Sequence, residues 1–444
     1  MQINASEKTI EGDLFSAFVA AGAISKANAD DPKKSSLVRC ARTDKGVHAA
    51  GNVISLKLIV EDPDVVKKIN DALPQQIRVW GIERTNGSFS CYQTCDSRWY
   101  EYLIPTYSFL PPHPQSFLGK KLVESAEKEG VFESYQSRQA DVASFWEDAE
   151  KEYVNPILGR LDPEIRNAVM EAIHSSEDAR KAADGVRSLA VEGDLTSKPN
   201  SHATTSATED PQLTDDWVMI GSGTASPDET PLGPINSEAL VNSVEQAESD
   251  PPPSKSILTP VEAAIKEVKA AYILAKKAYR ISAARLQRVQ DALSAYIGTR
   301  NFHNYTIQKS FKDPSAKRVI RSFTVAPSPL IINDTEWLSL KVHGQSFMMH
   351  QIRKMVAMVA LVVRCGAPLS RINESYRPDN ISIPKAPGLG LLLERPVFET
   401  YNERAVREFQ REKIDFDKFE KEIGEFKQRE IYERIFREEE KDHQ

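Results

Sequence analysis

Residues 39–51 read RCARTDKGVHAAG and place one acid, Asp44, among several basic side chains. Asp44-Lys45-Gly46 is typical of a turn, and a turn can present a carboxylate at the rim of a cleft. Nearby positive charge favours the ionised form of a carboxylate, so we expect Asp44 to be charged. The alternative is an ordinary hairpin turn with solvated basic residues, and turn chemistry alone explains most such segments.

The segment after this turn has the pattern of a half-buried strand. Between Asn52 and Val60, apolar residues alternate with Ser55 and Lys57, and a period of two is the signature of such a strand. The same kind of pattern predicts further elements along the chain. The expected helices are Thr9–Ala21, residues 62–73, Val261–Tyr279, a helix from Ala283 with Ser282 as its N-cap, and Gln345–Arg364; the expected strands are Ile77–Ile82, Ser97–Ile104, Trp337–Val342 and Leu391–Glu394.

The size and composition indicate a soluble protein of two or three domains. The chain has 444 residues, of which 40% are hydrophobic and 27% are charged. No apolar run approaches the roughly 20 residues of a membrane span, and residues 1–5 resemble no targeting leader. The four cysteines are too few for a disulfide framework, and no Cys/His pair near Cys91 and Cys95 completes a zinc site. We therefore expect reduced thiols in an intracellular protein.

The charge is unevenly distributed along the chain. The formal net charge is −7, but residues 109–259 carry 12 Lys and Arg against 27 Asp and Glu. The remainder therefore has a net charge of +8. A basic remainder is what a protein that contacts a phosphate backbone requires.

Composition divides the chain into four parts. Residues 1–108 alternate strands and helices with short links, which predicts a compact α+β lobe. Residues 109–259 form an acidic insertion, helical at first and then too poor in apolar residues to order. Residues 260–401 resume the globular pattern as a second lobe. Residues 402–444 form a charged helical tail, in which an apolar face could pack against the body.

Two segments of the second lobe have the residue types of an RNA contact. Aromatic residues in 296–305 precede a stretch with five basic residues, and such a combination can stack bases and bind phosphates. A loop anchored by core aromatics explains the same pattern equally well. Arg353 and Lys354 interrupt the apolar stripe of a predicted helix, and in isolation we would expect them to be solvated.

Three separated motifs resemble the signatures of one enzyme family. Residues 42–49 (RTDKGVHA), 96–102 (DSRWYEY) and 345–355 (QSFMMHQIRKM) are similar to motifs of the TruA family of tRNA pseudouridine synthases. Residues 298–305 and 386–391 match further family motifs in the same order. The details resemble the eukaryotic branch, and its fungal members in particular. The resemblance covers most of both lobes and favours a catalytic Asp44 over a plain turn.

The resemblance implies a role for individual residues. Asp44 would be the nucleophile that starts glycosidic cleavage when uridine is converted to pseudouridine. Arg353 would pair with Asp44 and hold it ionised. Tyr100 would stack on the flipped base and assist removal of the C5 proton, and water would be excluded so that the ribose recaptures the base. The implied substrate-binding residues are Arg42, Lys45, His48, Arg98, Phe302 and His350.

The family also implies a fold, partners and a location. We expect two α+β lobes whose mixed and antiparallel sheets join across a central basic cleft, the pseudouridine synthase fold. No metal, nucleotide or redox cofactor is implied. The expected partner is tRNA, with mRNA and small nuclear RNA as further candidates and no membrane. A monomer in the nucleus is the favoured state, with the mitochondrion and cytoplasm as alternative locations.

Two features depart from the family pattern. Family members begin with a strand before the first helix, whereas this sequence opens at Met1-Gln2. We therefore expect that strand to be missing and a sheet edge to be unpaired. Arg300 stands where the family more often has His. A non-catalytic RNA-binding module and an inactive truncated product are the alternatives to an enzyme, but mere binding would need no nucleophile such as Asp44.

Overall fold

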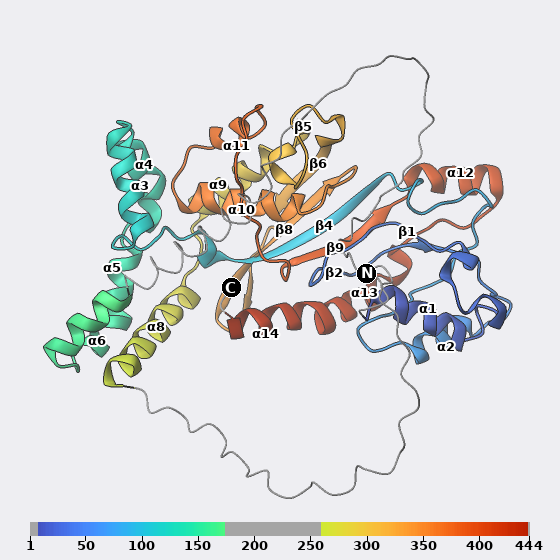
Figure 1. The fold of residues 1–444 in the computed structure, drawn as a ribbon, viewed down its shortest axis with the longest axis horizontal. Coiled ribbons are helices and arrows are strands. Elements are labelled where there is room, and N and C mark those ends of the chain that lie inside the picture. Colours follow the sequence, from blue (N-terminus) through green and yellow to red (C-terminus); the bar gives the residue numbers. More distant parts are fainter. Residues whose placement is uncertain (1–7, 174–258, 443–444) are drawn as a thin grey trace, which may run out of the picture.

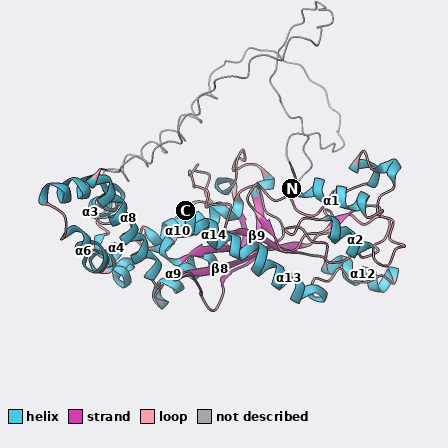
Figure 2. Cartoon of the chain, turned by 90° about the horizontal axis from the view of Figure 1, so that it is seen from below, coloured by secondary structure: helices cyan, strands magenta, loops and turns pink. Residues whose placement is uncertain are grey.

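A long central sheet lies in the middle of the molecule, with groups of helices beyond both of its ends (Figures 1 and 2). The computed structural model describes residues 8–173 and 259–442. The predicted disorder of the second half of the insertion lies outside these residues. The strands are β1 (Val38–Arg39), β2 (His48–Ala49), β3 (Ile54–Ser55), β4 (Ser97–Pro105), β5 (Gly298–Asn301), β6 (Lys317–Val325), β7 (Leu330–Ile332), β8 (Thr335–Gly344) and β9 (Leu391–Val397).

Helices account for most of the rest of the described chain. None of the helices in residues 8–173 and 259–442 is long and apolar enough to cross a membrane. Residues 163–173 are also helical. The labelled helices are α1 (Ile10–Ala20), α2 (Val65–Ala72), α3 (Phe117–Lys128), α4 (Phe132–Gln139), α5 (Phe145–Ala149), α6 (Asn155–Leu158), α8 (Pro260–Ala278), α9 (Ala283–Ser294), α10 (Gln351–Arg364), α11 (Ser370–Glu374), α12 (Glu399–Phe409), α13 (Glu420–Phe426) and α14 (Glu433–Asp442).

The seven-stranded sheet combines strands from both predicted lobes. Its order is β2-β9-β4-β8-β6-β5, and β7 pairs with β8 off this path. β2 pairs with β9 in parallel, whereas β4 pairs antiparallel with both β8 and β9. Tyr100 on β4 therefore lies between Val342 on β8 and Leu393 on β9. The predicted α+β class is confirmed.

The two faces of the sheet are covered by different parts of the chain. Because neighbouring residues on a strand point to opposite faces, Tyr102 packs with the core that α9 and α10 complete. Leu103 instead packs with Trp337 and with Phe436 of the C-terminal tail. The predicted packing of the tail against the body is thus confirmed.

Local sequence signals account for several helix starts. Thr9 caps α1 by accepting a hydrogen bond from the backbone N–H of Gly12, and Ser282 caps α9 in the same way, as predicted. Thr259 and Glu262 form a reciprocal capping box at the start of α8, with Pro260 in the first helical position. These caps satisfy backbone N–H groups that a helix start leaves without partners.

Three predicted elements differ from the structure. Of the strand expected over Asn52–Val60, Ile54–Ser55 alone is paired, and the strand expected over Ile77–Ile82 is extended chain without a ladder. The backbone N–H groups of Lys57 and Ile59 donate to carbonyl oxygens outside the strands, and both backbone groups of Val79 bond to the Asn70 side chain, so neither segment pairs with a strand there. α10 begins at Gln351 instead of Gln345 because His350 adopts a left-handed backbone conformation.

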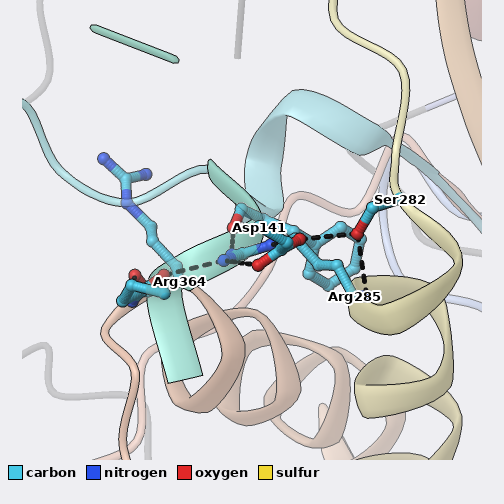
Figure 3. Close-up of polar contacts among 6 residues, drawn as sticks. Asp141, Ser282, Arg285 and Arg364 are labelled. Atoms are coloured by element: carbon cyan, nitrogen blue, oxygen red, sulfur yellow. Dashed lines mark hydrogen bonds and ion pairs between the residues drawn. The ribbon is translucent and has the colours of Figure 1, made fainter. Parts of the chain in front are cut away.

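The helical half of the insertion is joined to the second lobe by a buried arginine (Figure 3). Arg285 on α9 is 1% exposed, and its guanidinium donates to both carboxylate oxygens of Asp141 at 3.0 and 3.1 Å. It also donates to Gln139, whose side-chain amide donates to the carbonyl oxygen of Arg364 on α10. This network connects α4, α9 and α10 through fully or partly buried polar contacts.

Candidate active site

Asp44 lies at the start of the predicted turn. The backbone N–H of Val47 donates to the carbonyl oxygen of Asp44 at 3.1 Å, and Gly46 has a φ of 81°. A side chain at Gly46 would be strained, because positive φ disfavours residues with a Cβ. The Asp44 side chain is 40% exposed. The turn therefore presents the carboxylate to solvent at the edge of the sheet.

The described partner of Asp44 is His350. The imidazole Nδ1 of His350 lies 3.1 Å from the carboxylate Oδ2 of Asp44. This is within the range of an ion pair, although the N–H direction is too poorly aligned for a regular hydrogen bond. The sequence-based hypothesis gave Arg353 this position and His350 a contact with the substrate.

Arg353 lies beside the Asp44 turn but is engaged elsewhere. Its Nε donates to the carbonyl oxygen of Ala386 at 2.7 Å. A Cβ built on Gly388 would lie 3.6 Å from both the Arg353 guanidinium carbon and the Lys45 carbonyl oxygen. Gly388 therefore lies close to both the guanidinium and the turn. A direct pair between Arg353 and Asp44 remains a prediction.

Tyr100 lies in the middle of the sheet, next to a bulge. The register of β4 against β9 shifts between Trp99 and Tyr100, and such bulges often re-aim a side chain. The Tyr100 ring is 8% exposed and meets Phe347 edge to face at 5.2 Å. Burial raises the pKa of Tyr100 to about 12, although Arg98 acts in the opposite direction. At neutral pH the side chain is therefore a phenol.

Arg98 joins two of the three signature motifs. Its Nη2 donates to the carbonyl oxygen of Cys40 at 2.9 Å, and its Nη1 donates to that of Gln345 at 3.3 Å. The first contact holds the approach to the Asp44 turn, and the second holds the loop before α10. Arg98 is half-buried, so positioning these loops is the role that its contacts support.

The remaining predicted substrate-binding residues fall into three groups. Arg42 and Lys45 are exposed near Asp44 and are available to RNA. His48 lies on β2, where burial and Arg434 of the tail lower its pKa to about 4. Phe302 is 0% exposed and packs in an aromatic core, so the structure assigns it to the core and excludes RNA stacking in this conformation.

Three residues near the site were not singled out from the sequence. Phe347 contacts the Tyr100 ring, Gly388 lies close to both Arg353 and Lys45, and Lys385 acts electrostatically on His350. Gly388 lies within the motif at 386–391, and a Cβ at this position would make ordinary van der Waals contacts of 3.6 Å. Among the described residues, no group of three or more His, Cys, Asp or Glu side chains is arranged to hold a metal ion.

A cavity of about 1660 Å³ opens beside the turn. Asp44 and Lys45 stand at one part of its lining, and Trp80 and Phe416 at others. Its charged residues include both signs, such as Arg434 and Glu438 of the tail. The cavity therefore does not have the uniformly basic lining expected of a phosphate-binding groove.

The comparisons with known proteins identify the family of the chain. The family model for tRNA pseudouridine synthase matches residues 292–399, which contain the motif of α10. The chain is 41% identical to tRNA pseudouridine synthase 1 of Yarrowia lipolytica over 444 residues, covering 100% of this chain and 69% of that protein. It is 44% identical to tRNA pseudouridine synthase 1 of Schizosaccharomyces pombe over 450 residues, covering 99% and 78% of the two chains.

A third relative has a more specific name. The tRNA pseudouridine(27/28) synthase of Saccharomyces cerevisiae is 32% identical over 403 residues, covering 90% of this chain and 81% of that protein. These similarities define the class of the protein as a tRNA-modifying enzyme. The chain belongs to the tRNA pseudouridine synthase family.

Proposed function

We propose that this protein isomerises uridine to pseudouridine in tRNA, with Asp44 as the nucleophile. The main support for this assignment is that motifs far apart in the sequence lie together around Asp44 in the structure. His350 contacts Asp44, Arg98 ties the approach to the turn to the loop before α10, and Gly388 lies close to both Arg353 and Lys45. An exposed carboxylate among basic side chains is suited to attack a nucleotide of RNA, because the basic side chains attract its phosphates. An ion pair with a purely structural role would not need three separate motifs to meet at one place.

The reaction rearranges a nucleoside without adding or removing atoms. The N1–C1′ bond of uridine breaks, the base turns, and a C5–C1′ bond forms. The proton on C5 then leaves and N1 gains one, so the numbers of protons balance. Asp44 begins the cleavage, because a carboxylate can both form and release a covalent bond at moderate cost.

Tyr100 and Arg353 support the steps around the nucleophile. Tyr100 is a phenol at neutral pH, so it can assist removal of the C5 proton only as a relay that releases its own proton. Arg353 adds positive charge beside the turn and is fixed by Ala386, and a fixed charge stabilises developing negative charge without reorganisation. Tyr100 contacts Phe347 and is 8% exposed, so a base stacks on it only after neighbouring groups move.

Exposed cations in two segments bind the phosphate backbone. Arg42 and Lys45 lie in the turn, and Lys312, Lys317 and Arg321 are exposed in the basic stretch after Tyr305. Each neutralised phosphate releases counterions, so the affinity for RNA falls steeply with salt. The positive charge of the chain outside residues 109–259 supports this role.

We further propose that the protein also accepts mRNA and small nuclear RNA, acts as a monomer and resides in the nucleus. The family resemblance supports these assignments. Pseudouridine mapping in cellular RNA with and without the protein tests the first. Gel filtration with light scattering tests the second, and imaging of a tagged chain tests the third.

The test of the proposed function is a single substitution with a matched control. Asp44→Asn keeps the shape of the side chain and removes its charge. We expect it to abolish pseudouridine formation in a tRNA transcript while RNA affinity stays within a few-fold. Asp64→Ala is the control, because Asp64 is exposed and makes no capping hydrogen bond at α2. If Asp44→Asn is as active as the wild type, Asp44 is not the nucleophile. If the wild-type protein binds tRNA but forms no pseudouridine, it is an RNA-binding module and not an enzyme.

A further inference from the structure

The contact between His350 and Asp44 has no counterpart in the roles assigned above. The Nδ1–Oδ2 distance is 3.1 Å, and the His350 side chain is 16% exposed. Its poor alignment makes the contact close but loose. A loose contact restrains a nucleophile without holding it away from its target.

The backbone of His350 is also unusual. Its φ of 62° and ψ of 1° are left-handed, and it occupies the N-cap position of α10 without forming a side-chain capping hydrogen bond. Residues other than glycine rarely adopt this conformation, and such strain gathers at functional sites. The imidazole therefore does not stabilise the helix start in the usual way, and Asp44 is its described side-chain contact.

Charged groups face His350 from three elements. They are Asp44 from the turn, Lys385 from the loop before β9, and Arg353 from the first turn of α10. Burial lowers the pKa of His350 below its ordinary value, and the two cations act in the same direction, whereas Asp44 opposes them. His350 is therefore neutral at neutral pH, and the adjacent carboxylate favours the tautomer with the proton on Nδ1.

We propose that His350 is a positioning residue for Asp44, and that its neutral form holds the carboxylate beside Arg353 while leaving it free to react. This inference rests on the proposed function and deepens it. A neutral N–H donor binds a carboxylate weakly. The imidazolium adds a full opposite charge at the same distance, because protonation turns the contact into an ion pair.

The proposal predicts how the reaction depends on pH. When His350 gains a proton, it forms an ion pair with the Asp44 carboxylate. The ion pair keeps the carboxylate from reacting, so the single-turnover rate falls. The loss sets in below neutral pH because the pKa of His350 is lowered. The affinity for tRNA should not change with this protonation. The single-turnover rate constant measured at saturating enzyme should therefore show the pH dependence.

Two substitutions separate the side chain from the backbone. Asn tolerates positive φ and provides a neutral N–H that cannot be protonated, and Gly tolerates positive φ with no side chain. We expect His350→Asn to keep the rate at pH 7.5 within about threefold and to lose much of the fall toward pH 5.5. We expect His350→Gly to lower the rate about tenfold with the dissociation constant for tRNA within twofold. His343→Asn is the control, because His343 stacks on Trp99 and also has a lowered pKa.

Each outcome decides the proposal. A fall toward acid pH in His350→Asn equal to that of the wild type, or a wild-type rate in His350→Gly, overturns it. A weaker tRNA affinity in His350→Gly with an unchanged rate would instead make His350 a substrate-binding residue. If His343→Asn loses the fall in rate at acid pH, then His343 and not His350 causes that fall. Activity in the wild type and its loss in Asp44→Asn show that the proposed function stands even if this inference fails.

Discussion

Arg353 and Ala386 are joined by a hydrogen bond of 2.7 Å, from the arginine Nε to the backbone carbonyl oxygen. This bond fixes the guanidinium at its base and leaves its outer nitrogens on the side of Gly388 and the Asp44 turn. One side chain thus positions the loop before β9 and contributes charge near the nucleophile. Both tasks depend on the planar fork of arginine.

Arg353→Lys should therefore inactivate the enzyme while preserving its fold. A lysine keeps the charge but has one ammonium group, so it cannot both bind Ala386 and face the turn. We expect the single-turnover rate to fall about 100-fold, with the melting temperature within a few degrees. Pseudouridine formation with excess enzyme and thermal melting measure the two effects. Arg371→Lys, in an exposed pair with Glu374 on α11, is the control; equal losses in both variants would contradict this role.

His48 should make the fold sensitive to acid. Burial and Arg434 lower its pKa to about 4, against about 6.5 for a free imidazole. As the pH falls below 6.5, His48 binds a proton in the unfolded chain. In the folded chain it does so only near pH 4. The free energy of unfolding therefore decreases over this range, by about 3 kcal/mol at most.

His48→Asn removes this linkage, because asparagine does not titrate. Urea unfolding at intervals from pH 7 to 4 should give a flatter pH dependence for the variant than for the wild type. Contributions from carboxylates are common to both chains and cancel in the difference. Parallel curves would show that His48 is protonated equally in the folded and unfolded chains.

The pair of Asp141 and the buried Arg285 should contribute strongly to the docking of the helical insertion. Partial burial raises the pKa of Asp141, but hydrogen bonds from Arg285 and Ser282 outweigh it and lower the pKa. Asp141→Asn removes the charge that compensates a fully buried guanidinium, which typically costs about 3 kcal/mol. Chemical unfolding measures this loss. Asp148→Asn, on the exposed side of α5, should change stability by less than about 0.5 kcal/mol; a similar small change for Asp141→Asn would contradict the prediction.

The sequence correctly predicted the helix starts and the turn that depend on residues within a few positions of one another. Thr9 and Ser282 mark helix starts because their hydroxyl oxygens cap the first turn. The Asp44 turn was predictable because Gly46 tolerates its positive φ. The strand predicted over 97–104 corresponds to β4, in which residues 100–105 are all buried.

Long-range contacts decided the features that the sequence did not predict. The alternation in Ile77–Ile82 is that of a strand, but a strand also needs a neighbour in space. The aromatic residues around Phe302 suit a core and an RNA contact equally, and burial alone distinguishes them. The pairing of Asp44 with His350 depends on the relative placement of two lobes, for which no spacing in the sequence gives a signal.

Gly51 should be required for docking of the C-terminal tail. A Cβ at this position would lie 2.6 Å from the ring of Phe416 and 2.8 Å from the carbonyl oxygen of Glu394. The carbonyl belongs to β9 and cannot move easily, so we expect Gly51→Ala to displace Phe416 and also to strain the contact with β9. Overpacking of this kind costs about 1–3 kcal/mol.

Limited proteolysis and urea unfolding test this prediction together. In Gly51→Ala we expect faster cleavage within residues 410–420 and a lower free energy of unfolding. Gly87→Ala is the matched control, because nothing lies within 4 Å of a Cβ there and its backbone is unstrained. If both alanine variants resist protease and denaturant as the wild type does, Phe416 does not depend on the space at Gly51. If Gly51→Ala loses stability without faster cleavage of the tail, the clash is relieved by β9 instead.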